Sequence, residues 1–152
     1  MPQSLARVVV HIIFSTKHRR PWLKDANVRA ETYAYMATVL SENVDSPAML
    51  INGVEDHVHI LCSLSRKFAI KNVVEKAKTE TTKWMKRQSP KLRDFHWQNG
   101  YGVFSVSESK VAEVKRYIER QETHHRRMTF QDEFREICRR HGLEPDERYA
   151  WD

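Results

Sequence analysis

Two histidines separated by one residue, His57 and His59, form the first pattern in this sequence with the potential for chemistry. In an extended strand, alternate side chains point to the same side, so both imidazoles would lie on one face, roughly 6–7 Å apart along the chain. Two imidazoles at that spacing can reach one divalent cation. Glu55 and Asp56 come just before them and would either bind the same cation or orient one imidazole. Alone, the pattern is equally consistent with two unrelated histidines on a strand.

A tyrosine and a glutamine one helical turn apart, Tyr117 and Gln121, form the second pattern. Val111, Val114 and Ile118 fall on the other side of the same helix, where they would pack against a sheet. A phenol has an unperturbed pKa near ~10, so it needs a base or a metal to act as a nucleophile at neutral pH. A lone helical tyrosine is more often a surface residue with a packed ring and a solvated hydroxyl.

Positive charge is concentrated in the middle of the chain. The whole sequence has a net charge of +6, yet residues 66–93 contain ten lysines and arginines against two glutamates. The lysines that a helix here would place two turns apart are Lys71 with Lys78 and Lys76 with Lys83. A basic helix is often only a solvated face, but this concentration favours a polyanionic partner such as nucleic acid.

A second basic cluster follows the most apolar stretch of the sequence and contains Lys17, Arg19 and Arg20. Several aromatic residues near the two basic segments are candidates for stacking on nucleic-acid bases. They are Trp22, His96, Trp97 and Tyr101. Each of them, taken alone, is more often part of a hydrophobic core than a stacking surface.

The composition is typical of one globular domain, with 152 residues of which 40% are hydrophobic and 30% are charged. Cys62 and Cys138 form no C-x-x-C pair, which argues against a zinc ribbon. The most apolar stretch, residues 8–14, is far shorter than the ~20 residues that a membrane-spanning helix needs. The order of charge and apolar residues is opposite to that of a secretory signal. We therefore expect a cytoplasmic protein without a membrane partner.

Hydrophobic periodicity predicts the elements that would carry these residues. Strands are predicted at 8–14, 49–51, 57–63 and 101–106, and helices at about 25–43, 69–88 and 110–126, with one more between Thr129 and Gly142. The β-α-β-β-α-β order predicts an α+β fold, a ferredoxin-like antiparallel sheet with helices on one face, plus a C-terminal helical extension. We expect residues 1–127 to form the main domain and residues 128–152 to form a helical extension or tail of that domain.

Four segments together resemble the single-tyrosine HUH transposases of small bacterial insertion sequences, including the related REP-associated tyrosine transposases. They are Lys-His-Arg-Arg-Pro-Trp-Leu at 17–23, Asp-His-Val-His-Ile-Leu at 56–61, Trp-Gln-Asn-Gly-Tyr-Gly-Val-Phe-Ser-Val at 97–106 and Tyr-Ile-Glu-Arg-Gln at 117–121. Each segment alone is a weak signal, but their shared order and spacing are specific. The resemblance covers most of the chain, from Val8 to about Arg127.

The resemblance implies an enzyme, a metal-dependent nickase and strand transferase that acts on single-stranded DNA. His57 and His59 match the metal-binding histidines of the family, Gln121 its third metal ligand, and Tyr117 its nucleophile. The amide oxygen is a hard ligand that suits Mg²⁺ or Mn²⁺, although imidazoles also accept softer ions. Tyr117 would become joined to a 5′ phosphate, and the freed 3′ hydroxyl would later rejoin the strands without any nucleotide cofactor.

The resemblance also implies partners, namely single-stranded DNA, DNA hairpins near element ends, and a second copy of the chain in a homodimer. Family members often complete the histidine site of one chain with the tyrosine helix of the other, so the sequence leaves open in which chain Tyr117 acts. The DNA-binding candidates, carried over only as a region, are Lys17, Arg19, Arg20, Lys71, Lys76, Lys78 and Lys83.

Three other functions stay open at this point. A domesticated relative that processes palindromic repeats would use the same catalytic residues, and genomic context alone would separate it from a mobile element's transposase. A module that binds nucleic acid without cutting it would not need the intact set of His57, His59, Tyr117 and Gln121. A metal hydrolase that uses the two histidines with Asp56 would not need the tyrosine.

Overall fold

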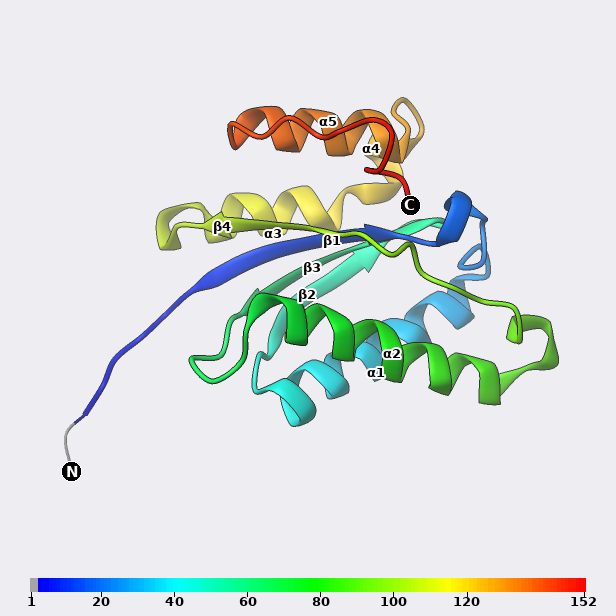
Figure 1. Cartoon of the computed structure of the whole chain (residues 1–152), viewed down its shortest axis with the longest axis horizontal. Coiled ribbons are helices and arrows are strands. Elements are labelled where there is room, and N and C mark those ends of the chain that lie inside the picture. The colour runs from blue at the N-terminus through cyan, green and yellow to red at the C-terminus, as the bar shows by residue number, and fades with distance from the viewer. Residues whose placement is uncertain (1–2) are drawn as a thin grey trace.

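Four strands form one antiparallel sheet at the centre of the molecule, in the order β2-β3-β1-β4 (Figure 1). The structure is a computed structural model that describes residues 3–152. The strands are β1 (Val9–Ser15), β2 (Ala48–Gly53), β3 (His57–Ser63) and β4 (Gly102–Val106). Because β3 lies between β1 and β2, and β4 pairs with the other side of β1, the sheet has the ferredoxin-like arrangement. The α+β prediction is confirmed.

Helices α1 (Ala26–Val44) and α2 (Ile70–Gln88) lie together on one face of the sheet, as predicted (Figure 1). The Asp25 carboxylate accepts hydrogen bonds from the backbone N–H groups of Asn27 and Val28 and so fixes the start of α1. Alternate residues of the central strands face these helices and form the main core. The strand residues of this core include Val10, Ile12, Phe14, Val58, Ile60 and Cys62. Burial of this layer is the main stabilising contribution to the α1–α2 side.

The opposite face of the sheet is covered by α3 (Val111–Glu119), α4 (Gln121–His125) and α5 (Phe130–Arg140) (Figure 1). The sequence predicted a single helix over 110–126, but the helix is interrupted at Arg120, where φ is −98° and ψ is 21°. The Arg120 N–H donates to the Tyr117 carbonyl, which tightens the last turn of α3. With α1 and α2 on one face and α3, α4 and α5 on the other, the sheet lies between two helical layers, and both of its faces are covered.

A short 3₁₀ helix, η1 (Lys17–Arg19), carries the first basic cluster at the end of β1. His18 and Arg19 have φ values of 57° and 54°, a left-handed conformation that residues other than glycine rarely adopt. The Thr16 N–H donates to the Asp56 carbonyl at 2.8 Å, and the Thr16 hydroxyl donates to the Arg20 carbonyl at 2.7 Å. These bonds hold the basic loop beside the start of β3.

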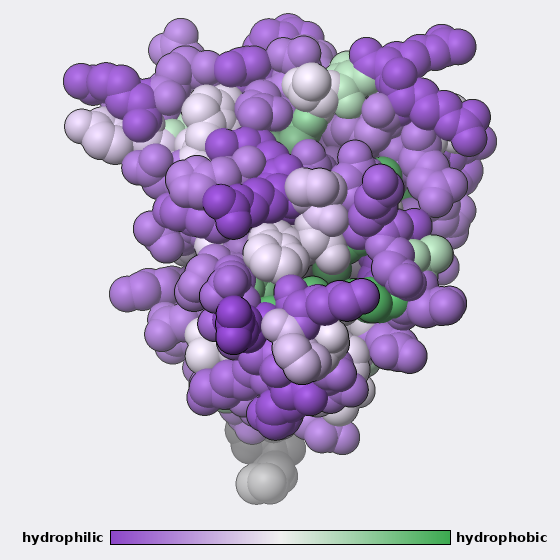
Figure 2. Space-filling view, turned by 90° about the vertical axis from the view of Figure 1, so that its right-hand side faces the viewer, coloured by the Kyte–Doolittle hydropathy of each residue, from purple (hydrophilic) through white to green (hydrophobic). Residues whose placement is uncertain are grey.

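The end of the molecule that carries η1 and the C-terminus has a largely hydrophilic surface with small apolar areas between polar side chains (Figure 2). A second 3₁₀ helix, η2 (Pro90–Leu92), lies beyond α2 at the same end, and a third, η3 (Glu108–Lys110), leads into α3. Across residues 3–152, no helix combines the length and the apolar character needed to cross a bilayer.

Candidate active site

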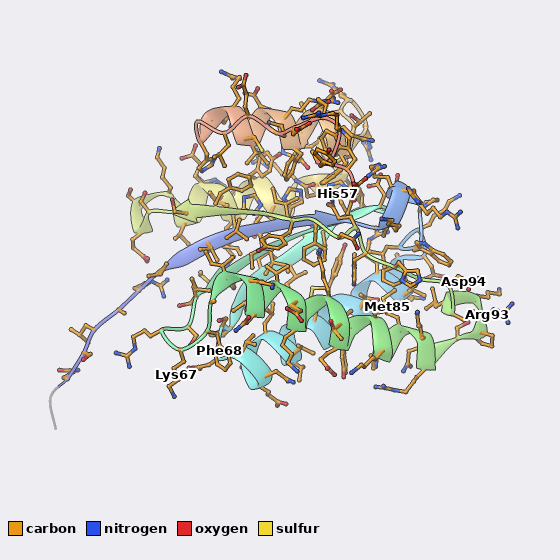
Figure 3. The ribbon with its side chains drawn as sticks, in the orientation of Figure 1. His57, Lys67, Phe68, Met85, Arg93 and Asp94 are labelled. Atoms are coloured by element: carbon orange, nitrogen blue, oxygen red, sulfur yellow. The ribbon has the colours of Figure 1, made fainter. Side chains whose placement is uncertain are left out.

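The two histidines of β3 point to the α3–α5 side of the sheet, and both side chains are completely buried. His57 lies opposite Ser15 of β1, and His59 lies opposite Ile13. Val58 and Ile60, between and after them, belong to the core on the α1–α2 side. The alternation predicted for this strand is confirmed. Figure 3 shows His57 between the sheet and the upper helical layer.

Tyr117, in the last turn of α3, and Gln121, at the start of α4, both lie beside these histidines. Gln121 is completely buried, and its Oε1 lies 3.2 Å from Nε2 of His57. The ring of Tyr117 lies 6.0 Å from the ring of His59, centre to centre, in an edge-to-face orientation. The sequence-predicted residues of the site therefore lie together, and Tyr117 lies beside the histidines of its own chain.

The structure adds Glu133, from the first turn of α5, to the centre of this cluster. Its side chain is 1% exposed, and its two carboxylate oxygens face different groups. Oε1 lies close to three imidazole nitrogens: His59 Nε2 at 2.9 Å, His125 Nε2 at 3.0 Å and His57 Nε2 at 3.3 Å. Oε2 accepts hydrogen bonds from the Tyr117 hydroxyl and, at 3.1 Å, from the Gln121 amide.

Sequence reasoning missed Glu133 as a site residue and did not place His125 among the metal ligands. A signal was present in the pattern of α5, where Phe130, Phe134 and Ile137 form the buried stripe. Glu133 follows Phe130 by three residues and precedes Ile137 by four, so it lies on that same stripe. A carboxylate on the apolar face of a helix is rarely buried without a partner. That position therefore points to a buried cation or a cluster of hydrogen-bond donors.

The ring nitrogens of the two strand histidines that face away from the cluster have hydrogen-bond partners of their own. Nδ1 of His57 donates to Asp56 Oδ1 at 2.7 Å. Nδ1 of His59 lies 2.8 Å from Nε2 of His11, a buried histidine on β1. Partners of this kind fix the orientation of an imidazole and leave its other nitrogen to a metal. Asp56 thus orients His57 from outside, which was one of the two roles considered for it.

The donor set suits a divalent cation. The nearest ligand atoms of His57, His59, His125 and Glu133 all lie within 4.8 Å of one another, and Gln121 Oε1 lies beside His57. Imidazole nitrogens together with carboxylate and amide oxygens can hold Mg²⁺ or Mn²⁺. The number of imidazoles favours Mn²⁺ over Mg²⁺, because Mg²⁺ prefers oxygen ligands. These residues are therefore able to hold the cation that the resemblance implies.

The charges in this cluster shift the pKa values of its members in opposite directions. Burial acts to lower the pKa of His57, but the Asp56 and Glu133 carboxylates outweigh burial and raise it to about 9. Burial lowers the pKa of His59 despite the nearby Glu133. Burial acts to raise the pKa of Glu133, yet the surrounding histidines hold it far below its ordinary range. Burial and the Glu133 charge raise the pKa of Tyr117, so without a cation the phenol stays protonated.

The raised pKa of His57 predicts a pH-dependent stability of the metal-free protein. The pKa of His57 is about 9 in the folded protein and 6.5 in the unfolded chain. Protonation of His57 therefore contributes to the free energy of unfolding, fully below pH 6.5, and this contribution is lost as the pH rises through 9. A pKa shift of this size contributes on the order of 3 kcal/mol to the free energy of unfolding. Urea unfolding of EDTA-treated protein at pH 6.5 and pH 10 measures it. The His57→Gln variant should not show this loss of stability between pH 6.5 and pH 10. An equal loss in the variant would contradict the assignment of the effect to His57.

A cavity of about 430 Å³ lies beside Tyr117, between β4, α3 and α5. Its lining includes Lys110 and Arg140 as well as the Tyr117 and His11 side chains. Glu113 also lines the cavity and pairs with Lys110 at 3.2 Å, and Arg140 pairs with Glu136 at 3.2 Å, so both cations have anionic partners. The cavity borders the Tyr117 side chain on the side away from α1 and α2.

The first basic cluster follows the end of β1, beside the start of β3 at His57. Arg20 is exposed, whereas two of its neighbours contact the C-terminal residues of the chain. Arg19 donates to the Trp151 carbonyl at 2.9 Å, and Lys17 donates to the Asp152 carbonyl at 3.1 Å. The chain's C-terminal segment therefore packs directly on a loop predicted to bind DNA.

The second basic cluster lies on α2, across the sheet from the histidines (Figure 1). In Figure 3, Lys67 and Arg93 lie near opposite ends of this layer, so the basic segment runs along the helix. Lys71, Lys76 and Lys83 are exposed. Lys78 instead donates to the carbonyls of the loop before β4, at 2.7 Å to Gly100 and 2.8 Å to Gln98, and burial lowers its pKa to about 8. Its ammonium group is thus already bound within the protein.

The aromatic candidates for base stacking have different positions. Trp97 is 6% exposed and packs edge-to-face on Phe14 and Phe95, so it belongs to the core. Trp22 packs on the outside of that core. His96 and Tyr101 are the two exposed members of the set, and Trp22 is partly buried.

The solved structures that are similar to this chain include two transposases. A candidate transposase from Deinococcus radiodurans R1 has a TM-score of 0.64 and 23% sequence identity, covering 80% of this chain and 95% of that one. A REP-associated tyrosine transposase bound to a REP hairpin has a TM-score of 0.60 and 14% identity, covering 100% of this chain and 90% of that one. At these identities the likeness supports the fold. No curated protein matches the sequence.

A family relationship is established by the sequence itself. Residues 4–121 match the family described as IS200-like transposases, which is well over half of the chain. The matched segment includes the strand histidines and extends through Tyr117 to Gln121, whereas Glu133 and the rest of α5 lie beyond it. The resemblance seen in the four sequence segments is confirmed, and the chain belongs to the family of IS200-like transposases.

Proposed function

We propose that this transposase nicks and rejoins single-stranded DNA through a 5′-phosphotyrosine intermediate formed on Tyr117. The observation that carries the proposal is the position of Tyr117, which lies with His57, His59 and Gln121 around one buried centre. A phenol beside a group of metal-binding side chains is an arrangement for nucleophilic attack on a phosphodiester. The family supports the same class of chemistry.

His57, His59 and Gln121 would hold the divalent cation, which when bound stabilises the negative charge that develops on the phosphodiester. The Tyr117 oxygen attacks the phosphorus, the bond from phosphorus to the 3′ oxygen breaks, and a free 3′ hydroxyl is released. The 5′ end stays joined to the protein. Attack by a 3′ hydroxyl on the phosphotyrosine reverses the step and rejoins a strand, so no nucleotide cofactor is consumed.

The DNA partner we propose includes a hairpin, as in the solved REP-associated relative with its bound REP hairpin. The basic loop at Lys17, Arg19 and Arg20 lies at the edge of the site and would contact the strand that enters it. The exposed lysines of α2 would contact phosphates of the duplex stem on the other face. Lys78 would contribute least, because its ammonium group already binds backbone carbonyls. We further propose that the protein works as a homodimer, in which each site is built from one chain.

Two alternative functions are less consistent with the geometry. A metal hydrolase that uses Asp56 as a ligand would require its carboxylate at the centre, whereas Asp56 Oδ1 binds the outward nitrogen of His57. A module that only binds nucleic acid would not need a buried carboxylate in contact with both the histidines and the tyrosine, which this chain has.

The direct test of the proposed function is covalent trapping. Purified protein is incubated with labelled single-stranded DNA from the flanks of its own gene, with Mn²⁺ or Mg²⁺ or with EDTA, and separated on a denaturing gel. A labelled protein band that requires the cation supports the proposal. Tight hairpin binding without any labelled band under either cation would contradict it.

The position of Tyr117 predicts that cleavage needs only one chain. Mixing Tyr117→Phe protein with His57→Ala protein should give no covalent adduct, because neither chain has a complete site. If the tyrosine acted in the partner's site, each mixed dimer would have one complete site, built from the intact His57 of one chain and the intact Tyr117 of the other. The mixture would then recover about a quarter of the wild-type activity after random exchange, and at most about half. Gel trapping of the mixture, after co-refolding to allow exchange of chains, measures this, and recovered adduct would contradict action within one chain.

A further inference from the structure

Glu133 contacts both halves of the proposed site and lies outside the part of the chain that matches the family. We propose that Glu133 is a catalytic residue: one carboxylate oxygen binds the divalent cation together with the histidines, and the other accepts the proton of Tyr117 as the tyrosine attacks. This inference rests on the proposed function and assigns it a general base and a further metal ligand.

The first half of the proposal rests on the surroundings of Oε1. Three imidazole nitrogens from two separate segments, His57 and His59 of β3 and His125 of α4, point at this oxygen from 2.9 to 3.3 Å. His125 is held in this orientation because its Nδ1 donates to the Met128 carbonyl at 2.7 Å. Nitrogens and a carboxylate oxygen that converge in this way form a site for a cation, whose charge would replace that of the imidazole protons.

The second half rests on the surroundings of Oε2. The Tyr117 hydroxyl donates a hydrogen bond directly to this oxygen, and the Gln121 amide donates to it from 3.1 Å. A general base must lie within hydrogen-bond reach of the proton it removes, and Glu133 meets that condition before any substrate is bound. In residues 3–152, Glu133 is the carboxylate to which the Tyr117 hydroxyl donates.

The two oxygens belong to one carboxylate, so the two roles depend on each other. Without a cation, the negative charge of Glu133 lies directly beside the phenol oxygen and favours the protonated phenol. A divalent cation on Oε1 would offset that charge and place a second positive charge near the phenol oxygen, which stabilises the developing phenolate. Activation of the tyrosine is thereby linked to occupancy of the metal site.

The proposed step is balanced in atoms and charge. The Tyr117 O–H proton moves to Glu133 Oε2 while an oxygen lone pair forms the new bond to phosphorus. The bond from phosphorus to the 3′ oxygen breaks, its electron pair stays on that oxygen, and a water molecule supplies the proton of the 3′ hydroxyl. In the rejoining step a 3′ hydroxyl attacks, its proton passes to water, and the proton held by Glu133 returns to the Tyr117 oxygen.

The competing role for a carboxylate at this position is to occupy the metal site and block it. The two roles predict opposite effects of Glu133→Gln, a substitution that keeps the size of the side chain and removes its charge. As a ligand and base, Glu133 is needed for cation binding. As a block, its loss would leave the three imidazoles free and strengthen cation binding.

The test is a calorimetric titration of wild-type protein and variants with Mn²⁺ in the absence of DNA. Glu133→Gln should bind Mn²⁺ at least ~10-fold more weakly than wild type, since even outer hydrogen-bond partners of metal ligands contribute 10- to 100-fold. Glu136→Gln is the matched control, because Glu136 lies on the same helix and forms exposed ion pairs with Arg139 and Arg140. This control should bind as wild type does. Unchanged or tighter binding by Glu133→Gln would overturn the ligand assignment.

The base role has its own measurement, the rate of covalent adduct formation at Mn²⁺ concentrations that saturate each variant. Glu133→Gln should remain slower by ~10²- to 10⁴-fold, the usual contribution of a general base. Glu133→Asp, which keeps a carboxylate on a shorter side chain, should recover part of this rate. Near-wild-type rates in saturated Glu133→Gln would overturn the base assignment.

The outcomes separate this inference from the proposed function. Thermal unfolding first establishes that Glu133→Gln is folded, and if it is not, the same measurements on Glu133→Asp, with weaker Mn²⁺ binding expected, decide the ligand role. If the wild-type protein forms an adduct and Glu133→Gln binds Mn²⁺ normally, the nickase function is supported and Glu133 is not a metal ligand. A wild-type protein that binds Mn²⁺ but forms no adduct would contradict the nickase itself.

Discussion

Replacing Tyr117 by phenylalanine is expected to abolish the covalent protein–DNA adduct completely and to leave DNA binding nearly unchanged. The substitution removes the hydroxyl that donates to Glu133 and keeps the ring. That ring stacks on His124, with centres 4.6 Å apart, so the packing of α3 against α4 should persist. The measurement compares trapped adduct on denaturing gels with hairpin affinity measured by fluorescence anisotropy.

Tyr101→Phe is the matched control for this result, because it also removes a phenol hydroxyl and keeps the ring. Tyr101 is 38% exposed on the loop before β4, and its ring lies beside the Lys78 ammonium group of α2. This variant should form adduct at the wild-type rate. An adduct that persists in Tyr117→Phe would remove Tyr117 as the nucleophile. A loss of hairpin binding in Tyr117→Phe, in parallel with the adduct, would show that the residue acts through structure and not through its hydroxyl.

Replacing His57 by alanine is expected to lower adduct formation by more than ~100-fold at any fixed concentration of Mn²⁺. His57 is completely buried, and its Nε2 lies next to both Gln121 Oε1 and Glu133 Oε1. Loss of hydrogen-bond partners outside a metal site alone costs 10- to 100-fold, and loss of a ligand costs more. The rate of adduct formation as a function of Mn²⁺ concentration measures the effect.

His96→Tyr is the control for the histidine substitution, because it removes an exposed imidazole on the loop after η2 and keeps an aromatic ring at this candidate stacking position. Its adduct rate and its dependence on Mn²⁺ should match those of the wild type. Thermal unfolding checks that His57→Ala remains folded, and His59→Ala provides a second variant of the same pair. Full activity of folded His57→Ala with unchanged dependence on Mn²⁺ would contradict a metal site at these histidines.

Much of the framework of the site could be predicted because it depends on local periodicity. The alternation of β3 determines that His57 and His59 share a face, and pairing with β1 then places that face. The spacing from Tyr117 to Gln121 places both on one side of a helical segment, even though the helix is interrupted between them. The signals for these residues therefore lie within short stretches of sequence.

The remaining parts of the site could not be predicted because they depend on contacts between distant segments. Glu133 reaches the histidines only because α5 folds back over the sheet, and His11 reaches His59 only through strand pairing. The contact of Arg19 with the Trp151 carbonyl likewise joins the two ends of the chain. No local spacing specifies such contacts, whose formation depends on the packing of the whole fold.

The most direct test of the central claim, that Tyr117 is the nucleophile of a metal-dependent DNA nickase, is to locate the covalent bond. Wild-type protein is trapped with single-stranded DNA and Mn²⁺, the DNA is trimmed with nuclease, and tryptic peptides are analysed by mass spectrometry. The account predicts a nucleotide phosphate on Tyr117, in the peptide from Tyr117 to Arg120, and none in the EDTA sample. A nucleotide attached to any other residue, or a DNA nick without any covalent peptide, would contradict it.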